Sequence, residues 1–110
     1  MELNSKTEGG LTIVALKGRV DAVTAPEFEK KMIEAIEKGD RKILLNMAGL
    51  EYISSAGLRS ILTIAKRLKA ENGEIFFAEL KGAVEEVFKI SGFNSIFKVF
   101  ESEKTALENI

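Results

Sequence analysis

The sequence predicts an α/β fold, α+β under a strict sheet definition, with a mixed and mostly parallel sheet of four or five strands. Strand-like and helix-like apolar patterns alternate along the chain, as in sheets built from crossover units. The run Ile43-Leu44-Leu45 is unbroken, which is typical of a strand covered on both faces. Gly9-Gly10 separates two alternating runs and predicts an opening β-hairpin, so at least one strand pair is antiparallel.

The first helix is expected in the segment DAVTAPEFEKKMIEAIEKGD, after the hairpin strands ELNSKTE and LTIVALKG. Thr24 and Glu27 have the spacing of a capping box, and Pro26 falls in the first turn, where its missing N–H does no harm. Gly39 is expected to end the helix. Helical spacing places one apolar stripe on Phe28, Met32, Ala35 and Ile36.

The remaining elements follow in alternation. We expect a strand at residues 41–47, a helix from about residue 55, a strand after the Asn72-Gly73 turn and a helix ended by Gly92. SIFKVF is expected to form a short strand, and a last helix is capped by Ser102. The buried face of the helix from residue 55 is predicted to hold Leu58, Ile61, Leu62, Ala65 and Leu68, and that of the next helix Leu80, Val84, Val87 and Phe88.

Composition limits the classes of function. The 110 residues are expected to form one domain, 1–110, and 16 basic against 17 acidic side chains leave no basic footprint for direct nucleic-acid binding. The sequence has no cysteine, no apolar run long enough to span a bilayer and no signal-peptide pattern at its start, so we expect a cytoplasmic protein without membrane contact. We expect a monomer or a weak dimer.

The absence of histidine and cysteine removes most catalytic chemistry. Catalytic triads, thiolate nucleophiles and histidine-ligated metal sites are all excluded, and we expect no catalytic residue, no metal and no cofactor. The best case for an enzyme is the S-x-x-K spacing of Ser95 and Lys98. On the expected strand, however, these two side chains point to opposite faces, and no accompanying motif is present.

The junction EYISSAGL, residues 51–58, is the most informative local feature. Ser54 is well placed as an N-cap and Ser55 as the first residue of the following helix. In one interpretation Ser54 caps the helix and Ser55 is merely tolerated. In the other, the electropositive helix start accommodates a phosphate on Ser55, and Gly57 leaves room for an approaching phosphate or protein surface.

Three segments resemble, in order and spacing, the STAS-domain anti-sigma factor antagonists. They are GRVDAVTAPEFEKKM, ILLNMAGLEYISSAGLRSIL and GFNSIFKVFESEKTAL, and the similarity covers essentially the whole chain. The resemblance implies a small mixed sheet with about four helices packed largely on one side. It also places the family's phosphoacceptor on Ser55, within the segment Ser54-Ser55-Ala56-Gly57-Leu58.

The function implied by this resemblance is partner switching. An unphosphorylated antagonist binds an anti-sigma factor that is also an ATP-dependent serine kinase, and sigma factor is released. Phosphorylation separates the complex, and a PP2C-like phosphatase restores the antagonist. Asp21 and Thr24 match the family's loop on the same partner-binding surface, to which we also assign Ser54, Ser55, Ala56, Gly57 and Arg59.

Two positions depart from the family's pattern, and one rival function stays open. Ser54 stands where many members carry Asp, so it is the second choice as phosphoacceptor, and Asn46 occupies another position often held by Asp. The rival is a STAS-type regulatory subunit of a larger signalling assembly that serine phosphorylation does not switch. The cluster of Phe93, Phe97 and Phe100 is either part of the core or a partner patch.

Overall fold

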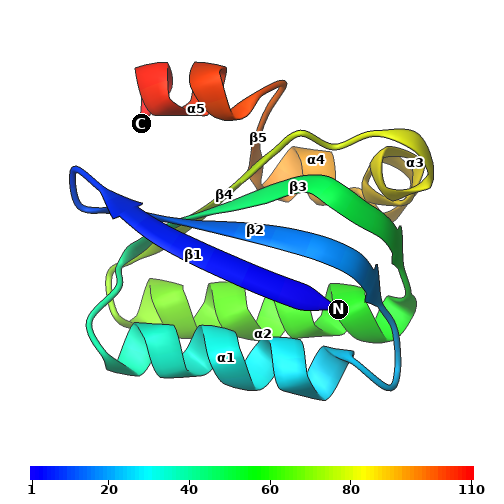
Figure 1. Ribbon diagram of the computed structural model, residues 1–110, viewed down its shortest axis with the longest axis horizontal. Coiled ribbons are helices and arrows are strands. Elements are labelled where there is room, and N and C mark those ends of the chain that lie inside the picture. Colours follow the sequence, from blue (N-terminus) through cyan, green and yellow to red (C-terminus); the bar gives the residue numbers. More distant parts are fainter.

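The structure, a computed structural model that describes residues 1–110, has five strands and five helices around one sheet (Figure 1). The strands are β1 (Glu2–Glu8), β2 (Leu11–Val20), β3 (Lys42–Ile53), β4 (Glu74–Ala78) and β5 (Lys98–Phe100). The helices are α1 (Ala25–Glu37), α2 (Ser55–Ala70), α3 (Gly82–Ser91), α4 (Phe93–Ile96) and α5 (Glu103–Asn109). This order confirms the predicted alternation and adds one short helix, α4.

The sheet has the strand order β1-β2-β3-β4-β5. β1 and β2 are antiparallel and the other three pairs are parallel, as predicted. Gly9 and Gly10 both have positive φ, +53° and +81°, which a tight hairpin turn of the primed type requires. Because β2 and β3 are parallel and pair Val20 with Ile53, the segments that follow both strands start at the same edge of the sheet.

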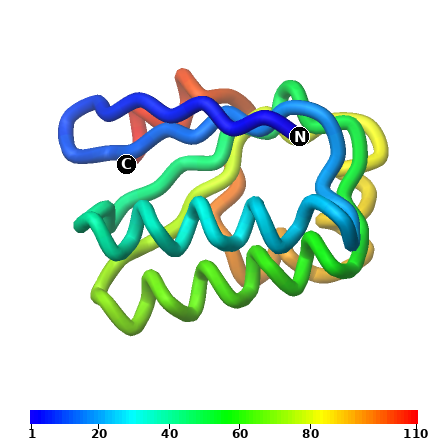
Figure 2. Tube along the Cα trace, turned by 60° about the horizontal axis from the view of Figure 1, so that its bottom comes forward, coloured from blue at the N-terminus to red at the C-terminus, as the bar shows by residue number.

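The main core lies between one face of the sheet and helices α1 and α2, which run side by side in both ribbon and tube views (Figures 1 and 2). Its buried helical side chains include Phe28, Met32 and Ile36 of α1, Ile61, Ile64 and Leu68 of α2, and Val84 and Phe88 of α3. Burial of such side chains is the main stabilising term of a domain of this size. The helices thus pack largely on one side, as the resemblance implies.

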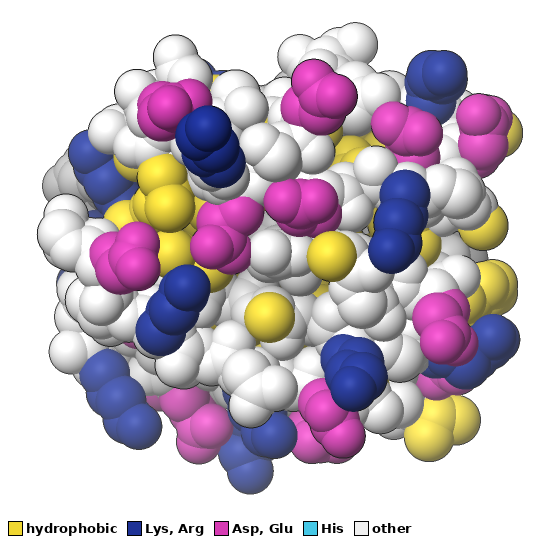
Figure 3. Space-filling view, turned by 45° about the horizontal axis from the view of Figure 1, so that its top comes forward, with side chains coloured by type: hydrophobic (Ala, Val, Ile, Leu, Met, Phe, Trp, Pro, Cys, Tyr) yellow, Lys and Arg dark blue, Asp and Glu magenta, His cyan; other side chains and the backbone are white.

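Helix α5 lies across the sheet from α1 and α2 (Figure 1). Ala106 packs there on a smaller cluster that includes Leu44 and Phe76, and the Asn46 amide donates to Glu103 Oε1 at 2.9 Å. Asn46 therefore ties β3 to α5. Seen from the side on which α5 lies, charged side chains of both signs are interspersed and hydrophobic ones form only small separate patches (Figure 3).

The predicted capping box at the start of α1 is wrong. Thr24 does precede the helix, but its side chain makes no capping hydrogen bond. Its hydroxyl lies 2.9 Å from the carbonyl oxygen of Arg19, because the chain turns sharply between β2 and α1 and brings the end of β2 within reach.

The predicted strand SIFKVF is shorter than expected. Only Lys98–Phe100 is strand; Ser95 and Ile96 belong to α4, which starts after Gly92, and Phe97 is an extended residue between the two elements. Gly92 has the left-handed conformation that ends α3, as predicted. The rings of Phe93 and Phe97 pack edge-on at 5.3 Å between centroids and hold this turn against the core. Phe93 is buried while Phe97 and Phe100 are half-buried, so the aromatic cluster belongs mainly to the core.

Two further details of the helices differ from prediction. On α2, Ile64 is buried and Leu62 is exposed, since the stripe that faces the sheet follows Gly57, Ile61, Ile64 and Leu68. Leu80 precedes α3, which begins at Gly82, although Leu80 still packs on the core. None of the helices combines the length and apolar character needed to cross a membrane.

Candidate functional site

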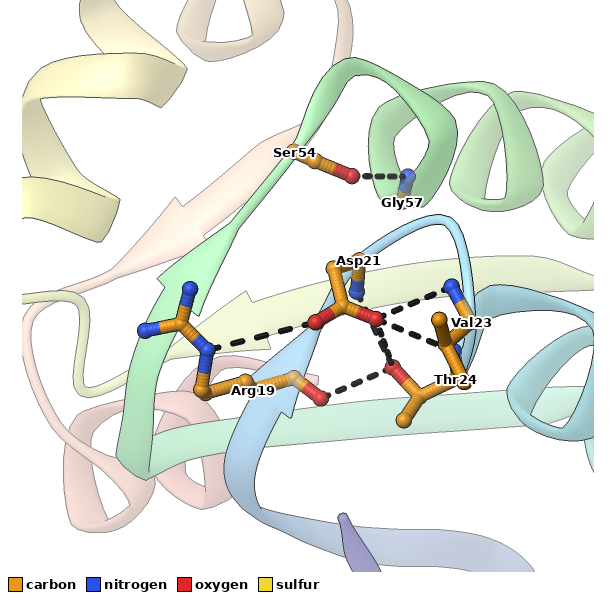
Figure 4. A network of polar contacts seen from close by, with 6 residues as sticks. All are labelled: Arg19, Asp21, Val23, Thr24, Ser54 and Gly57. Carbon is orange, nitrogen blue, oxygen red and sulfur yellow. Dashed lines mark hydrogen bonds and ion pairs between the residues drawn. The ribbon is translucent and has the colours of Figure 1, made fainter.

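The two serines at the junction between β3 and α2 have different structural roles. Ser54 is extended, and its N–H donates to Val20 O at 2.9 Å, which continues the pairing of β3 with β2. Its Oγ accepts from the N–H of Gly57 at 3.4 Å, so Ser54 is the N-cap of α2, as predicted (Figure 4). Ser55 follows as the first helical residue, and it is exposed and its hydroxyl has no hydrogen-bond partner within the chain.

Gly57 is needed for packing rather than for access. It is buried under the first turn of α2, and a Cβ at this position would lie 2.7 Å from Ile53 Cγ1 and 2.9 Å from Val20 Cγ1. Ala56 is half-buried and also packs on the core. We predicted that Gly57 leaves room for an approaching phosphate, and this reason is wrong. A glycine is needed here because the first turn of α2 lies too close to β2 and β3 to accommodate a side chain.

The turn between β2 and α1 is held by Asp21 and Thr24. Asp21 Oδ1 accepts from the N–H groups of Val23 and Thr24, at 3.0 and 3.1 Å, and lies 3.3 Å from Thr24 Oγ1 (Figure 4). These hydrogen bonds, led by that from the Thr24 N–H, and the charge of Arg19 hold the pKa of Asp21 below its ordinary value. Both predicted residues thus shape the turn, and between them Val23 is 86% exposed.

Arg19 links this turn to β3. Its guanidinium lies 4.2 Å from the centroid of the Tyr52 ring, and its Nε lies 3.9 Å from Asp21 Oδ2. Arg19 and Tyr52 are register partners in the parallel pair of β2 and β3. The sequence analysis did not select Arg19 or Tyr52. Arg19 lies two positions before Asp21, and Tyr52 lies two positions before Ser54. The register of the two parallel strands is therefore the signal that could have identified both residues.

The structure therefore brings the two predicted segments to one edge of the sheet. The hydrogen bond from Ser54 N to Val20 O sets the β3–α2 junction directly beside the β2–α1 turn. Arg59 lies one helical turn beyond Ser55 and is exposed. We call the following exposed or half-buried residues the junction surface: Arg19, Asp21, Val23, Tyr52, Ser55 and Arg59.

The electrostatics of the junction surface favour an added negative charge at Ser55. Helix α2 has 16 residues, no acidic side chain in its first turn, and two basic side chains in its last turn. The unpaired N–H groups at its start carry about half a positive charge, which an anion there would neutralise. The neighbouring turn carries one opposing charge, that of Asp21, whose pKa is lowered by the hydrogen bond from the Thr24 N–H.

The pair Ser95 and Lys98 does not form a comparable site. Ser95 lies on α4 rather than on the strand that the sequence predicted, and Lys98 begins β5. The ammonium group of Lys98 pairs with Glu74 Oε2 at 3.1 Å. No hydrogen bond joins Lys98 to Ser95, and the ammonium group is engaged by a carboxylate instead.

Comparison with known proteins assigns the family. The sequence model of the STAS domain matches residues 2–106. The chain belongs to the STAS domain family. The resemblance noted in the sequence is thereby confirmed, and the match includes both segments that build the junction surface.

The relatives of this STAS domain carry a common description. BtrV of Bordetella bronchiseptica, described as an anti-sigma factor antagonist, is 42% identical over 106 residues, which cover 96% of this chain and 91% of BtrV. The crystal structure of the similarly described TM1081 of Thermotoga maritima superposes with a TM-score of 0.92 at 23% identity, covering 98% of this chain and 93% of that one. This second likeness confirms the predicted fold.

A third comparison is with a protein whose structure is known in two forms. Structures of the anti-sigma factor antagonist SpoIIAA exist in an unphosphorylated form and, for the Bacillus protein, in a phosphorylated form. Each superposes on this chain with a TM-score of 0.74, at 18% and 20% identity, and covers 97% of it and 96% and 97% of SpoIIAA. The fold of this STAS domain is thus shared with a protein known in both states.

Proposed function

We propose that this STAS domain is an anti-sigma factor antagonist controlled by phosphorylation of Ser55. In its unphosphorylated form it binds an anti-sigma factor that is also a serine kinase, and it thereby frees sigma factor in the cytoplasm. Phosphorylation separates the two proteins, and a PP2C-like phosphatase removes the phosphate. The observation that carries the proposal is the exposed hydroxyl of Ser55 at the start of α2, beside a neighbouring serine that is already engaged as the cap.

The choice of Ser55 over Ser54 follows from their hydrogen bonds. Ser54 is half-buried and its Oγ accepts from Gly57 N, and losing such a cap costs about 1 kcal/mol. Esterification of Ser54 would place a bulky dianion inside the tight first turn. The hydroxyl of Ser55 makes no capping hydrogen bond, and because Ser55 is exposed a kinase can reach it.

We expect the phosphate to act on the docked partner and not on the stability of the domain. At the start of a helix a phosphate is stabilised by about 0.3–1 kcal/mol, so the domain stays folded when Ser55 is modified. The added charge of about −1.5 to −2 acts instead on the docked partner, through repulsion and through the cost of desolvating the phosphate. Asp21, ionised beside it, adds to the negative field of the same surface.

In this scheme the chemistry belongs to the kinase. The kinase supplies ATP, its base takes the proton of the Ser55 hydroxyl, the new O–P bond forms to the γ-phosphorus, and ADP leaves. The STAS domain contributes a substrate hydroxyl and a docking surface. It needs no cofactor of its own and acts as a regulator rather than as an enzyme, in keeping with the description of its relatives.

Intact-mass analysis after incubation with a candidate kinase and ATP tests the proposal. We expect one phosphoryl group on the unmodified chain and on Ser54→Ala, and none on Ser55→Ala. Ser54→Ala is the matched control, because it removes the neighbouring hydroxyl and leaves that of Ser55. Labelling of Ser55→Ala but not of Ser54→Ala would move the site to Ser54. Stable binding to the kinase without labelling of any variant would favour the rival function as an unswitched subunit.

A further inference from the structure

Arg59 is the one arginine of the chain that is not held by an acidic side chain. Arg19 pairs with Asp21, and the others pair as Arg41 with Glu71 and Arg67 with Glu37. Arg59 is exposed on α2, and its guanidinium forms neither an ion pair nor a hydrogen bond within the chain. Its backbone alone is engaged, where Arg59 O accepts from the Thr63 hydroxyl at 3.1 Å.

The position of Arg59 relative to Ser55 is specific. Ser55 is the first residue of α2 and Arg59 is four residues further along the same helix. Side chains at this spacing are neighbours, with Cβ atoms about 5–6 Å apart. An acidic group placed four residues before a basic one is also the favourable order on a helix, because both then complement the helix dipole.

We propose that Arg59 exchanges its counter-ion when Ser55 is phosphorylated. While Ser55 is free, the guanidinium of Arg59 is available to an acidic side chain of the docked partner. Once Ser55 carries a phosphate, Arg59 folds back by one turn and pairs with it. This inference rests on the proposed phosphorylation of Ser55, and it adds a second effect to the switch: the phosphate withdraws an attractive charge as well as adding a repulsive one.

The other charges around the junction surface do not compete for this role. Arg19 is engaged by Asp21 and by the ring of Tyr52. Lys66 lies on the same helix as Arg59, but 11 residues beyond Ser55 it is about 16 Å away along the axis. That separation is twice the screening length of about 8 Å at physiological salt. Asp21 is acidic and repels a phosphate.

The phosphate itself reports the pairing. Phosphoserine placed at residue 55 during translation gives the modified protein without any kinase, and a ³¹P NMR titration then measures the second pKa of the phosphate. We expect this pKa to be higher in Arg59→Gln than in the unsubstituted phosphoprotein by about 0.15–0.4, because a guanidinium beside it stabilises the dianion. Lys66→Gln, which removes the same charge further along α2, is the matched control and leaves the pKa unchanged.

Binding measurements test whether Arg59 contacts the partner while Ser55 is unphosphorylated. With the kinase that labels Ser55, we expect unphosphorylated Arg59→Gln to bind about 5- to 10-fold more weakly, the loss typical of one charge-assisted contact, and Lys66→Gln to bind as the unsubstituted chain does. The factor by which phosphorylation weakens binding is then smaller in Arg59→Gln. Equal phosphate pKa values in Arg59→Gln and Lys66→Gln, or undiminished binding of Arg59→Gln, overturn the exchange. A chain that no kinase labels at Ser55 refutes the proposed function instead, and the titration still decides whether Arg59 pairs with the phosphate.

Discussion

Asp21 and Thr24 hold each other by reciprocal hydrogen bonds: Asp21 N donates to Thr24 Oγ1 at 2.9 Å, and Thr24 N donates to Asp21 Oδ1 at 3.1 Å. These two side chains therefore determine the shape of the turn that faces Ser55. In the proposed complex, we expect them to act by presenting Val23 and by fixing the neighbouring end of β2.

Replacing Thr24 by Val removes the hydroxyl and keeps the branched shape. The N–H of Asp21 then loses its acceptor in a half-buried turn, which costs about 1–2 kcal/mol in the free energy of unfolding. Urea denaturation measures this loss. The control is Thr63→Val, whose hydroxyl bonds only Arg59 O on the exposed side of α2, and we expect it to change stability by less than about 0.5 kcal/mol. Equal effects of the two substitutions would show that the turn does not depend on Thr24.

The carboxyl of Asp21 makes the stability of the turn depend on pH. Its pKa is lowered below 3.8 in the folded chain, so its contribution is complete above pH 3.8 and is lost as the pH falls through the lower folded value. We expect the unsubstituted chain to be more stable than Asp21→Asn by a constant amount between neutral pH and about pH 5, and this difference to shrink below pH 3.8. Unfolding curves of both chains across that range provide the measurement, and a difference that grows on acidification would contradict the assignment.

Val23 is expected to contact the partner without supporting the fold. Because the Val23 side chain is 86% exposed, we expect Val23→Ser to change the free energy of unfolding by less than about 0.5 kcal/mol. We expect the same substitution to weaken binding to the kinase about tenfold, as for an apolar anchor at the centre of an interface. Ile96→Ser is the control: Ile96 is also exposed, but it lines a groove with Lys69 and Asn72 at the opposite end of α2. If Val23→Ser and Ile96→Ser bind the kinase with equal affinity, Val23 is not part of the interface.

Substitution of Gly57 tests whether this glycine is needed for packing or for access to Ser55. In Gly57→Ala the new Cβ meets Ile53 and Val20 well inside contact distance, and we expect a loss of about 1–3 kcal/mol despite the better helix propensity of alanine. Thermal unfolding measures the loss. If this variant is as stable as the unsubstituted chain and yet the kinase fails to label it, the glycine serves access to Ser55 after all.

Ser55→Asp adds a charge at the exposed start of α2. We expect an equal or slightly greater free energy of unfolding, by up to about 1 kcal/mol, because the carboxylate complements the helix dipole. Binding to the kinase should weaken, though less than with phosphoserine, since a carboxylate carries one charge instead of about two. A titration of the kinase with both forms tests this, and unchanged affinity of Ser55→Asp argues strongly against a charge-controlled interface.

The sequence by itself determined the features that depend on neighbouring residues. The Gly9-Gly10 hairpin, the cap at Ser54 and the left-handed end at Gly92 each follow from local backbone geometry, and all three are found in the structure. The order of strands and helices follows from apolar periodicity in the same way. These features are readable because the residues that form each of them lie within a few positions of one another.

Only the tertiary structure decided the features that depend on distant segments. The Thr24 hydroxyl turns to Arg19 O rather than capping α1, because the end of β2 comes within reach. Gly57 is required by Val20, 37 positions earlier, and Arg19 meets Tyr52 only through the register of two parallel strands. Such contacts are set by how α2 and the strands pack against one another, and packing is a property of the whole chain that no local pattern encodes.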